Sequence, residues 1–267
     1  MSVRDSVKKH VPERFFPLLM EAGGRVMAPI YRGKKYYCPC CQGTFRKMLP
    51  GGVSQRENAV CPGCNAYERH RLLWLYLNEK LAVYKREMIL LHIAPEYVFR
   101  KMFRSLPNIQ YVGAGIEAPF ADIEMDITAI EQEDNSYDAI ICNHVLEHVP
   151  KDVQAMRELH RVLKPGGWAI LQVPLDLTLE NTYEDFTIQS PEDRLKHFGQ
   201  EDHVRLYGRD YKDRLQDAGF TVSVDRYREE FSPSVAERFC LPENEDIYLC
   251  TKTDTTDRQE NSTQHRN

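Results

Sequence analysis

Four of the eight cysteines are arranged as two CxxC pairs. Cys38 and Cys41 form the first pair, and Cys61 and Cys64 form the second. Proline and glycine accompany both pairs, and at this spacing two such turns let four thiolates converge on one Zn²⁺. Four thiolates leave no coordination position for water, so the predicted zinc is structural and takes no part in catalysis.

Disulfide formation is the alternative fate of these thiols. The N-terminal stretch MSVRDSVKKHVPERFFPLLM is too charged and interrupted for a secretory signal, so we expect a reducing compartment and assign the chain to the cytoplasm. A thioredoxin-like redox pair is disfavoured, because two pairs are present and no βαβ pattern surrounds them. Cys40 is a spare thiol beside the predicted site and could exchange with one of the ligands.

A second group of polar residues follows the apolar run 139–142. Asn143 and His144 come directly after this run, and Glu147 and His148 complete an H-x-x-E-H motif. In zinc proteases this motif requires a long helix that presents both imidazoles on one face. Pro150 follows too closely for such a helix, so we predict a loop in which Glu147 and His148 have a structural or substrate-facing role.

The elements that position these residues are predicted over 136–174. The apolar run predicts a buried strand, a helix begins after Pro150, Lys164–Gly167 ends it, and 168–173 predicts a second strand. Strand, helix and parallel strand form one βαβ unit of an α/β sheet. Ligands bind beyond the carboxyl ends of such strands, which here are 143–148 and 174–177.

The sequences YDAIICNHVLEHV and ELHRVLKPGGWAILQVP resemble the second half of a class I S-adenosylmethionine-dependent methyltransferase of the type 11-like group. The resemblance covers roughly residues 88–250. It implies an α/β fold with a doubly wound, mostly parallel, seven-stranded Rossmann-like sheet, to which the small zinc-binding module is added at the N-terminal side. It also implies S-adenosylmethionine (SAM) as cofactor and a methyl acceptor, whose class the sequence does not identify: RNA, a sugar or cell-envelope intermediate and a small molecule all stay open.

The resemblance places the cofactor at the ends of the first four strands. The first strand is expected to end near His92, and the second is expected over 109–114. The carboxylate that binds the ribose hydroxyls normally follows the second strand, and the acid that contacts adenine follows the third strand, expected at 123–125. The cofactor-binding residues implied in this way are His92, Ala94, Glu96, Glu117, Asp126, Asn143 and His144.

The loop after the first strand departs from the family. Ala94 and Glu96 stand where glycines are usual, and His92 stands where an acid is usual. A rival glycine loop, Gly113–Gly115, lies too close to Asp138 in the chain to leave room for two βα units. The atypical loop keeps one alternative open: a non-catalytic binding protein with a methyltransferase-like fold and a degenerate cofactor loop.

The segment after the second strand of the βαβ unit carries the predicted acceptor side, which in the family forms a lid. His203 could accept a proton because its pKa is near neutrality, and Asp176 is a comparable catalytic candidate. Arg205 could hold an anionic acceptor. Alignment of acceptor, methyl and sulfur alone can supply roughly 7–11 kcal/mol, so few catalytic side chains are required.

Five segments are expected along the chain. They are an N-terminal helical segment over 1–35, the four-cysteine ribbon over 36–66, a connecting helix over 67–86, the methyltransferase domain over 87–250 and a disordered polar tail over 251–267.

Charge is divided unevenly along the chain. Residues 1–90 carry 16 Lys and Arg against 7 Asp and Glu, and the remainder carries 19 against 33, which gives balances of +9 and −14. A basic front could attract RNA, but a solvated surface explains such a balance more often, so nucleic acid is not favoured as a partner. No apolar run is long enough to cross a bilayer, so no transmembrane segment is expected. The N-terminal helix could pack on the body or touch a membrane surface, and the sequence does not indicate an oligomeric state.

Overall fold

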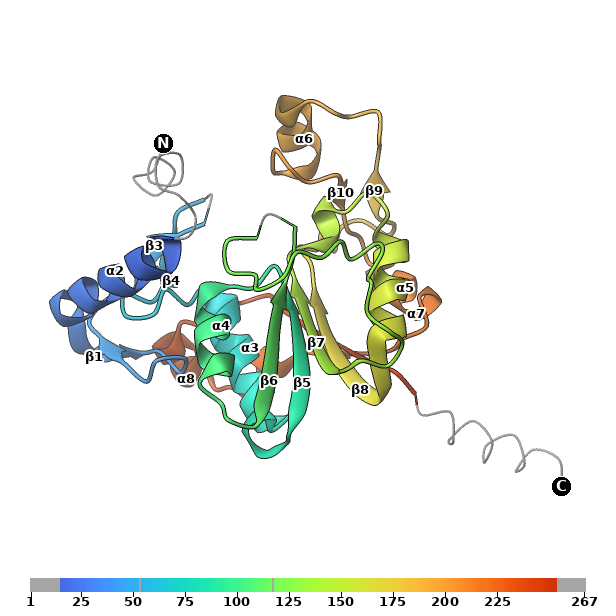
Figure 1. The fold of residues 1–267 in the computed structure, drawn as a ribbon. Coiled ribbons are helices and arrows are strands. Elements are labelled where there is room, and N and C mark those ends of the chain that lie inside the picture. The colour runs from blue at the N-terminus through green and yellow to red at the C-terminus, as the bar shows by residue number, and fades with distance from the viewer. Residues whose placement is uncertain (1–14, 53, 117, 254–267) are drawn as a thin grey trace, which may run out of the picture. The chain divides into compact units, whose positions relative to one another are not determined.

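The computed structural model describes residues 15–52, 54–116 and 118–253, and its contacts divide the chain into two compact units (Figure 1). The first unit consists of Met1–Arg86, Glu96–Ile109 and Arg226–Asp246. The second consists of Glu87–Pro95, Gln110–Asp225 and Ile247–Asn267. The predicted ribose ligand Glu117 and most of the predicted tail lie outside the described residues.

A six-stranded sheet forms the centre of the second unit, with the strand order β11-β12-β8-β7-β5-β6. Its strands are β5 (Met88–Ile93), β6 (Ile109–Ala114), β7 (Tyr137–Asn143), β8 (Leu163–Gln172), β11 (Thr221–Asp225) and β12 (Ile247–Thr251). β5, β7 and β8 are parallel neighbours, and β12 and β11 close one side in antiparallel pairing. The predicted Rossmann-like, mostly parallel sheet is therefore confirmed.

The prediction of seven strands is wrong. The strand expected at 123–125 is reduced to a single parallel bridge between Ala114 and Ile123. The Gly113 carbonyl accepts from the amides of both Asp122 and Ile123, at 2.7 and 3.1 Å, which turns the backbone away from a regular ladder. Only Met125 of the expected strand is buried, so little apolar surface is available to hold a further strand at this edge.

The β7–α5–β8 unit confirms the predicted βαβ arrangement. α5 (Asp152–Val162) buries Ala155, Met156 and Leu159 in the core that also contains the side chains of Ile140 and Leu171. Residues at this spacing lie on one face of a helix, so α5 covers the sheet with its apolar side. α7 (Tyr211–Asp217) contributes to the same core.

The glycine turn after α5 differs from its prediction. The helix ends at Val162, and β8 begins directly at Leu163. Leu163 lies opposite Tyr137 and Trp168 lies opposite Ala139, so the residues between them form a bulge inside β8. Gly166 has φ +74°, a conformation that glycine adopts without steric cost. β8 therefore contains both the glycine turn that follows α5 and the residues that pair with β7.

The segment between β8 and α7 folds around a short antiparallel pair. β9 (Tyr183–Glu184) pairs with β10 (Arg205–Leu206), and α6 (Pro191–Phe198) lies on the connection between them. Ser190 caps α6 by accepting from the Asp193 amide at 3.1 Å, and Gly199 ends it with φ +83°. The 3-10 turn η3 (Leu146–His148) contains Glu147, which confirms that the H-x-x-E-H motif is not on a long helix.

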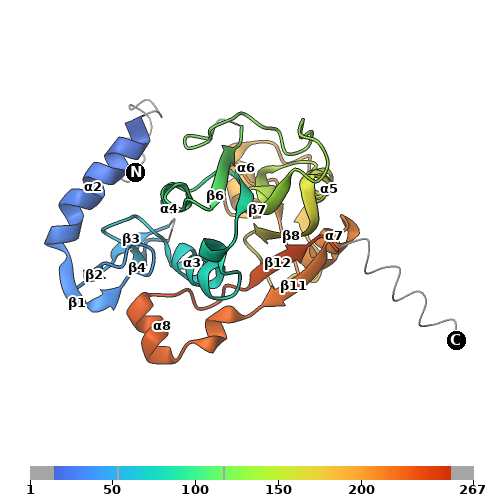
Figure 2. The same ribbon diagram turned by 60° about the horizontal axis from the view of Figure 1, so that its bottom comes forward.

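The first unit contains the cysteine pairs. Figure 2 shows the ribbon of its strands and helices. Its strands form two antiparallel pairs, β1 (Arg32–Tyr37) with β2 (Thr44–Phe45) and β3 (Leu49–Gly51) with β4 (Arg56–Val60). Its helices are α2 (Phe16–Ile30), α3 (Glu68–Glu79), α4 (Tyr97–Arg104) and α8 (Pro233–Phe239), with short 3-10 turns η2 (Val83–Lys85) and η4 (Tyr227–Glu230).

Side-chain contacts join distant segments within the first unit. The buried Arg71 guanidinium of α3 donates to the Cys240 carbonyl, and the Tyr227 hydroxyl donates to Glu79 at 2.6 Å. The rings of Trp74 and Phe103 meet edge to face. These contacts place 96–109 and 226–246 with the cysteine module, so the structure groups the chain differently from the single methyltransferase range predicted over 87–250.

Further observations concern the two ends of the described chain. α2 exposes apolar side chains such as Leu18 and Val26, both 62 % exposed, so membrane contact by this helix stays a prediction. No helix in the described ranges has the length and hydrophobicity needed to cross a bilayer. Thr251 is the last residue of β12, so the predicted tail begins too early.

Candidate functional site

The four predicted zinc ligands converge in the first unit. The Sγ atoms of Cys38, Cys41, Cys61 and Cys64 all lie within 4.8 Å of one another. Each pair is closed by a turn hydrogen bond between its first cysteine carbonyl and the amide four residues later, at 2.8 Å to Gln42 and 2.9 Å to Asn65. Both of these residues have positive φ, +58° and +62°, which bends each turn back so that its thiols face inward.

The sulfur distances fit a metal better than a disulfide. Cys38 Sγ lies 3.6 Å from Cys64 Sγ, and Cys41 Sγ lies 3.7 Å from Cys61 Sγ. A tetrahedron with zinc–sulfur bonds of about 2.3 Å has sulfur–sulfur edges of about 3.8 Å, whereas a disulfide measures about 2.05 Å. All eight cysteines are free thiols. The cluster therefore has the donor set and the spacing of a four-thiolate metal site.

Cys40 has a different environment from its neighbours. Its thiol donates to the His70 carbonyl at 3.7 Å, and burial raises its pKa well above the usual value. By contrast, hydrogen bonds from neighbouring thiols, Cys40 first, hold the pKa of Cys38 well below the usual range. Hydrogen bonds with Cys38 raise the pKa of Cys61 and Cys64 as well. The contact with the His70 carbonyl, and not the pKa, therefore sets Cys40 apart from the predicted ligands.

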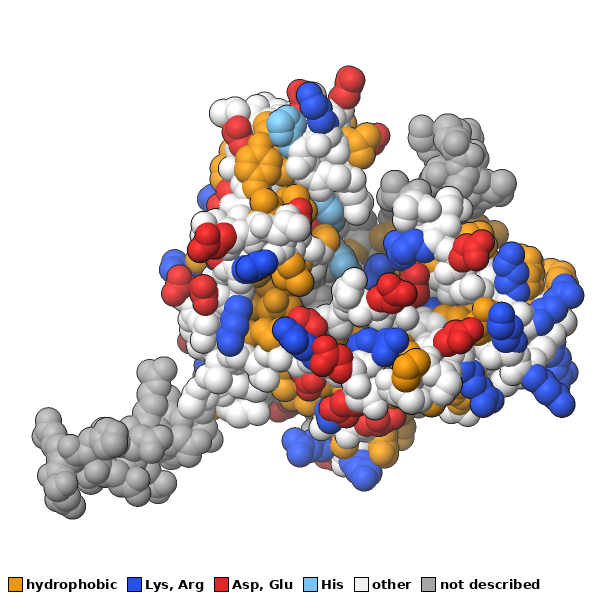
Figure 3. Space-filling view, turned by 180° about the vertical axis from the view of Figure 1, so that it is seen from behind, with side chains coloured by type: hydrophobic (Ala, Val, Ile, Leu, Met, Phe, Trp, Pro, Cys, Tyr) orange, Lys and Arg blue, Asp and Glu red, His pale blue; other side chains and the backbone are white. Residues whose placement is uncertain are grey.

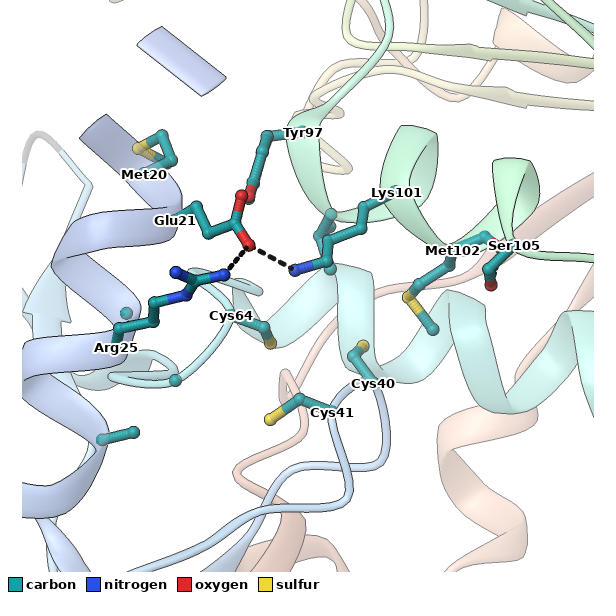
Figure 4. A pocket seen from close by; sticks show the side chains of 14 residues that line it. Met20, Glu21, Arg25, Cys40, Cys41, Cys64, Tyr97, Lys101, Met102 and Ser105 are labelled. Carbon is teal, nitrogen blue, oxygen red and sulfur yellow. Dashed lines mark hydrogen bonds and ion pairs between the residues drawn. The ribbon is translucent and has the colours of Figure 1, made fainter. Parts of the chain in front are cut away.

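A cavity of about 440 Å³ lies beside the cysteine cluster, between α2 and α4 (Figure 4). Figure 4 shows the Glu21 carboxylate between Arg25 and Lys101, at 3.0 and 3.9 Å. Much of the remaining lining is apolar or sulfur, including Met20 and Met102. The one acid among the described lining residues is already paired with two cations, so we assign no catalytic role to this cavity.

The carboxyl ends of β5, β7 and β8 bring several of the predicted cofactor residues to one edge of the sheet in the second unit. Ile93 is in register with Cys142, and Asn143 is in register with Gln172, so Ala94, Asn143 and His144 follow at the same edge. Ala94 and His144 have φ of +44° and +54°. Non-glycine residues held in this conformation are strained, and such strain is concentrated at functional sites.

Two other predicted cofactor residues have partners of their own. His92 is fully buried, and its Nδ1 lies 3.1 Å from the Tyr111 hydroxyl on β6. Glu96 precedes α4, and its carboxylate lies 3.7 Å from His70 Nε2 within the first unit. These contacts give His92 and Glu96 structural roles, while their contact with the cofactor stays a prediction.

Asp126 lies exposed at the turn that replaces the expected third strand. Its Oδ1 accepts from both the amide and the hydroxyl of Thr128, each at 2.8 Å. This local contact orients the carboxylate and leaves Oδ2 available to an adenine. The assignment of Asp126 to adenine stays a prediction.

A cluster of histidines surrounds a buried carboxylate at the end of β7. Glu147 is 1 % exposed, and its Oε1 lies 3.5 Å from His144 Nδ1 and 4.0 Å from His148 Nε2. His203 lies against His148, with ring centroids 4.7 Å apart. The Val204 amide donates to the Glu147 carbonyl at 2.9 Å, which fixes the two segments side by side. Ligand atoms of Glu147, His148 and His203 all lie within 4.8 Å of one another.

Arg205 is not placed to bind an acceptor. Its side chain has no exposed surface, and it donates to the carbonyls of Leu146, Val149 and Pro150 at 2.8, 2.6 and 2.9 Å and to the Glu184 carboxylate at 3.0 Å. The guanidinium therefore fixes the turn that carries Glu147. Sequence reasoning missed this role because a single arginine in a loop has no pattern that indicates its partners.

The two tentative catalytic residues differ in their capacity to accept a proton. Hydrogen bonds from the hydroxyl and amide of Thr178 hold the pKa of Asp176 below its usual value, so its carboxylate is a weak base at neutral pH. Burial lowers the pKa of His203, against the opposing effect of Glu147. A neutral imidazole can either accept a proton or bind a metal, so of the two residues His203 is better suited to chemistry.

Comparison with known proteins agrees with this geometry. Residues 97–223 match the family model described as "Methyltransferase domain". A ubiquinone biosynthesis O-methyltransferase from Albidiferax ferrireducens is 36 % identical over 62 residues, which are 23 % of this chain and 21 % of that protein. A demethylmenaquinone methyltransferase from Staphylococcus epidermidis is 39 % identical over 67 residues, 25 % of this chain and 23 % of that protein. The chain thus matches about a fifth of the length of these curated relatives.

Solved structures also resemble the chain, with lower sequence identity. The YcgJ protein from Bacillus subtilis has a TM-score of 0.46 and 15 % identity, over 69 % of this chain and 99 % of that one. A likeness of this size assigns no function. Residues 97–223 are therefore similar to methyltransferase domains, and the similarity leaves the acceptor open.

Proposed function

We propose that this protein is a SAM-dependent methyltransferase with a structural zinc module. The observation that carries the proposal is the match of residues 97–223 to the methyltransferase domain, which includes the complete β7–α5–β8 unit. Methyl transfer from a sulfonium needs alignment more than dedicated side chains. The edge of the sheet holds backbone and polar groups at fixed positions, which is what alignment of the cofactor with an acceptor requires.

Residues of the second unit fit the predicted cofactor at this edge. Ala94 and His144 have left-handed backbone where the first and fourth strands of the family end, and their amides donate to the Ala114 and Gln172 carbonyls at 2.7 and 2.8 Å. Asn143, Asp126 and Glu117 would supply polar contacts to the methionine moiety, the adenine and the ribose, respectively. The cofactor supplies the activated methyl group, and the protein residues hold it in line with the acceptor.

We further propose that the cysteine cluster holds Zn²⁺. The sulfur distances of 3.6 and 3.7 Å support this, and four thiolates leave the metal without an open position for water. The zinc would stabilise β1–β4, whose two-stranded pairs are marginal alone.

Lys and Arg side chains gather over the N-terminal zinc-binding module in Figure 3, so an anionic acceptor stays among the candidates. The free thiols agree with the cytoplasm as the predicted compartment.

One alternative is a non-catalytic binding protein with the same fold. It is favoured by the loop after β5, where Ala94 replaces a glycine and its amide donates to the Ala114 carbonyl at 2.7 Å. An amide used in this way is not available to a cofactor.

Calorimetric titration with S-adenosylhomocysteine separates the two proposals. We expect binding by the zinc-loaded protein, and we expect Asp126→Ala to weaken it about 10- to 150-fold, because a charge-assisted hydrogen bond is worth about 1.5–3 kcal/mol. Asp185→Ala is the matched control, since Asp185 accepts from Thr187 in the same local turn at 2.9 and 2.6 Å. Absence of binding by the wild-type protein would favour the non-catalytic alternative.

A further inference from the structure

We propose that Glu147, His148 and His203 form a second metal site, which binds a divalent transition-metal cation. The site lies in the second unit and shares no residue with the cysteine cluster. The binding of the cation does not depend on the proposed function. Its role next to a methyl acceptor does rest on that function.

Hydrogen bonds within the second unit bring the three proposed ligands together. Glu147 and His148 lie on η3, and the Leu146, Val149 and Pro150 carbonyls in and beside this turn are fixed by Arg205. His203 precedes Val204, whose amide donates to the Glu147 carbonyl at 2.9 Å. Two segments that are far apart in the chain are thus held in one arrangement.

The buried Glu147 carboxylate has too few hydrogen-bond partners within the described residues, and a bound cation would supply the missing interaction. Glu147 Oε2 is buried and has no hydrogen-bond partner within the described residues, and the same is true of His144 Nε2. The nearest groups to Oε1 are imidazole nitrogens at 3.5 and 4.0 Å, beyond good hydrogen-bond distance. Burying a carboxylate without partners costs several kcal/mol, so a site that keeps one buried indicates a counter-charge.

The donor set indicates the kind of cation. Two imidazoles and one carboxylate suit first-row transition metals, whereas Mg²⁺ and Ca²⁺ prefer oxygen ligands. Three protein ligands leave coordination positions open, in contrast to the closed four-thiolate site.

The position of the site suggests what the open coordination positions bind. Asn143 and His144 end β7, where the methionine moiety of the cofactor is predicted, so the cation would lie close to the methyl group. A metal lowers the pKa of a bound hydroxyl and fixes its oxygen. The acceptor would then be a compound that offers a hydroxyl oxygen to the cation, and His203 would be a ligand and no longer the proton acceptor.

Titration of the zinc-loaded protein with Mn²⁺, followed by water-proton relaxation, tests the site. We expect one Mn²⁺ bound per chain, with affinity reduced at least tenfold in Glu147→Gln and in His203→Ala. His197→Ala is the matched control, because His197 is an exposed histidine of α6, and its affinity should equal that of the wild type.

The outcomes are distinguishable from those of the proposed function. Glu147→Gln keeps the shape of the side chain, and retained binding of S-adenosylhomocysteine by this variant shows that the fold is intact. Wild-type protein that binds Mn²⁺ no better than Glu147→Gln does would overturn the metal site. Wild-type protein that binds Mn²⁺ through Glu147 but does not bind S-adenosylhomocysteine would support the metal site and overturn the proposed function.

Discussion

Replacement of Arg205 by methionine tests how the candidate site is held in place. Arg205 donates to three backbone carbonyls and to Glu184 while fully buried, and Met fills a similar volume without any donor. Removing one partner of a buried charge pair costs about 3–5 kcal/mol. At about 2–4 °C per kcal/mol for a chain of this size, the midpoint of thermal unfolding should fall by about 6–20 °C.

Differential scanning calorimetry measures this shift, and Arg209→Met is the matched control. Arg209 is exposed and makes a hydrogen bond to the Leu177 carbonyl, so its loss should lower the midpoint by no more than about 2 °C. The Arg205 variant should also lose Mn²⁺ affinity, because the turn that carries Glu147 is released. Equal midpoints for the two variants would refute the structural role of Arg205.

Three further predictions concern the zinc ligands, the cofactor loop and pH. Cys64→Ser should lower the zinc content measured by atomic emission by one zinc per chain relative to the wild type, while Cys240→Ser, outside the cluster, should leave it unchanged. Ala94→Gly should raise the free energy of unfolding by up to about 1 kcal/mol in denaturant titration, because its φ of +44° strains any residue with a Cβ; a loss of stability would contradict this. The Arg161 ion pair holds the pKa of Glu158 below its usual 4.5, so the pair stabilises the fold above that pH and the stabilisation disappears as pH falls through the lower folded pKa. The midpoint difference between wild type and Glu158→Gln should therefore be about 1–3 °C at pH 7 and should shrink as pH falls below 4.5, and a difference that persists unchanged in acid would count against the pair.

Much of the fold could be predicted because its elements carry local signals. The apolar run 139–142, which lies within β7, is short, continuous and bounded by polar residues, which is the pattern of a buried strand. β5 and β6 were expected from the family resemblance. The missing strand at 123–125 could not be foreseen from its composition. Its failure follows from pairing at the sheet edge, where the Gly113 carbonyl accepts from two successive amides.

The two candidate sites also differ in how far they could be predicted from the sequence. The four cysteines were predictable because their spacing alone indicates a tetrahedral site. The cluster around Glu147 was not predictable, because His203 lies far along the chain and is held beside Glu147 by long-range contacts such as those of Arg205 and the Val204 amide. Long-range contacts of single polar residues leave no periodic signal in a sequence.

The most direct test of the central claim is transfer of a labelled methyl group. Zinc-loaded protein is incubated with methyl-labelled SAM and cell extract, which is then separated into RNA, protein, lipid and small molecules. We predict label in one fraction, dependent on the protein and reduced by Asp126→Ala but not by the turn-matched Asp185→Ala, whose contact with Thr187 is of the same kind. Transfer of label to no fraction, with S-adenosylhomocysteine nevertheless bound, would contradict the assignment of this protein as a methyltransferase.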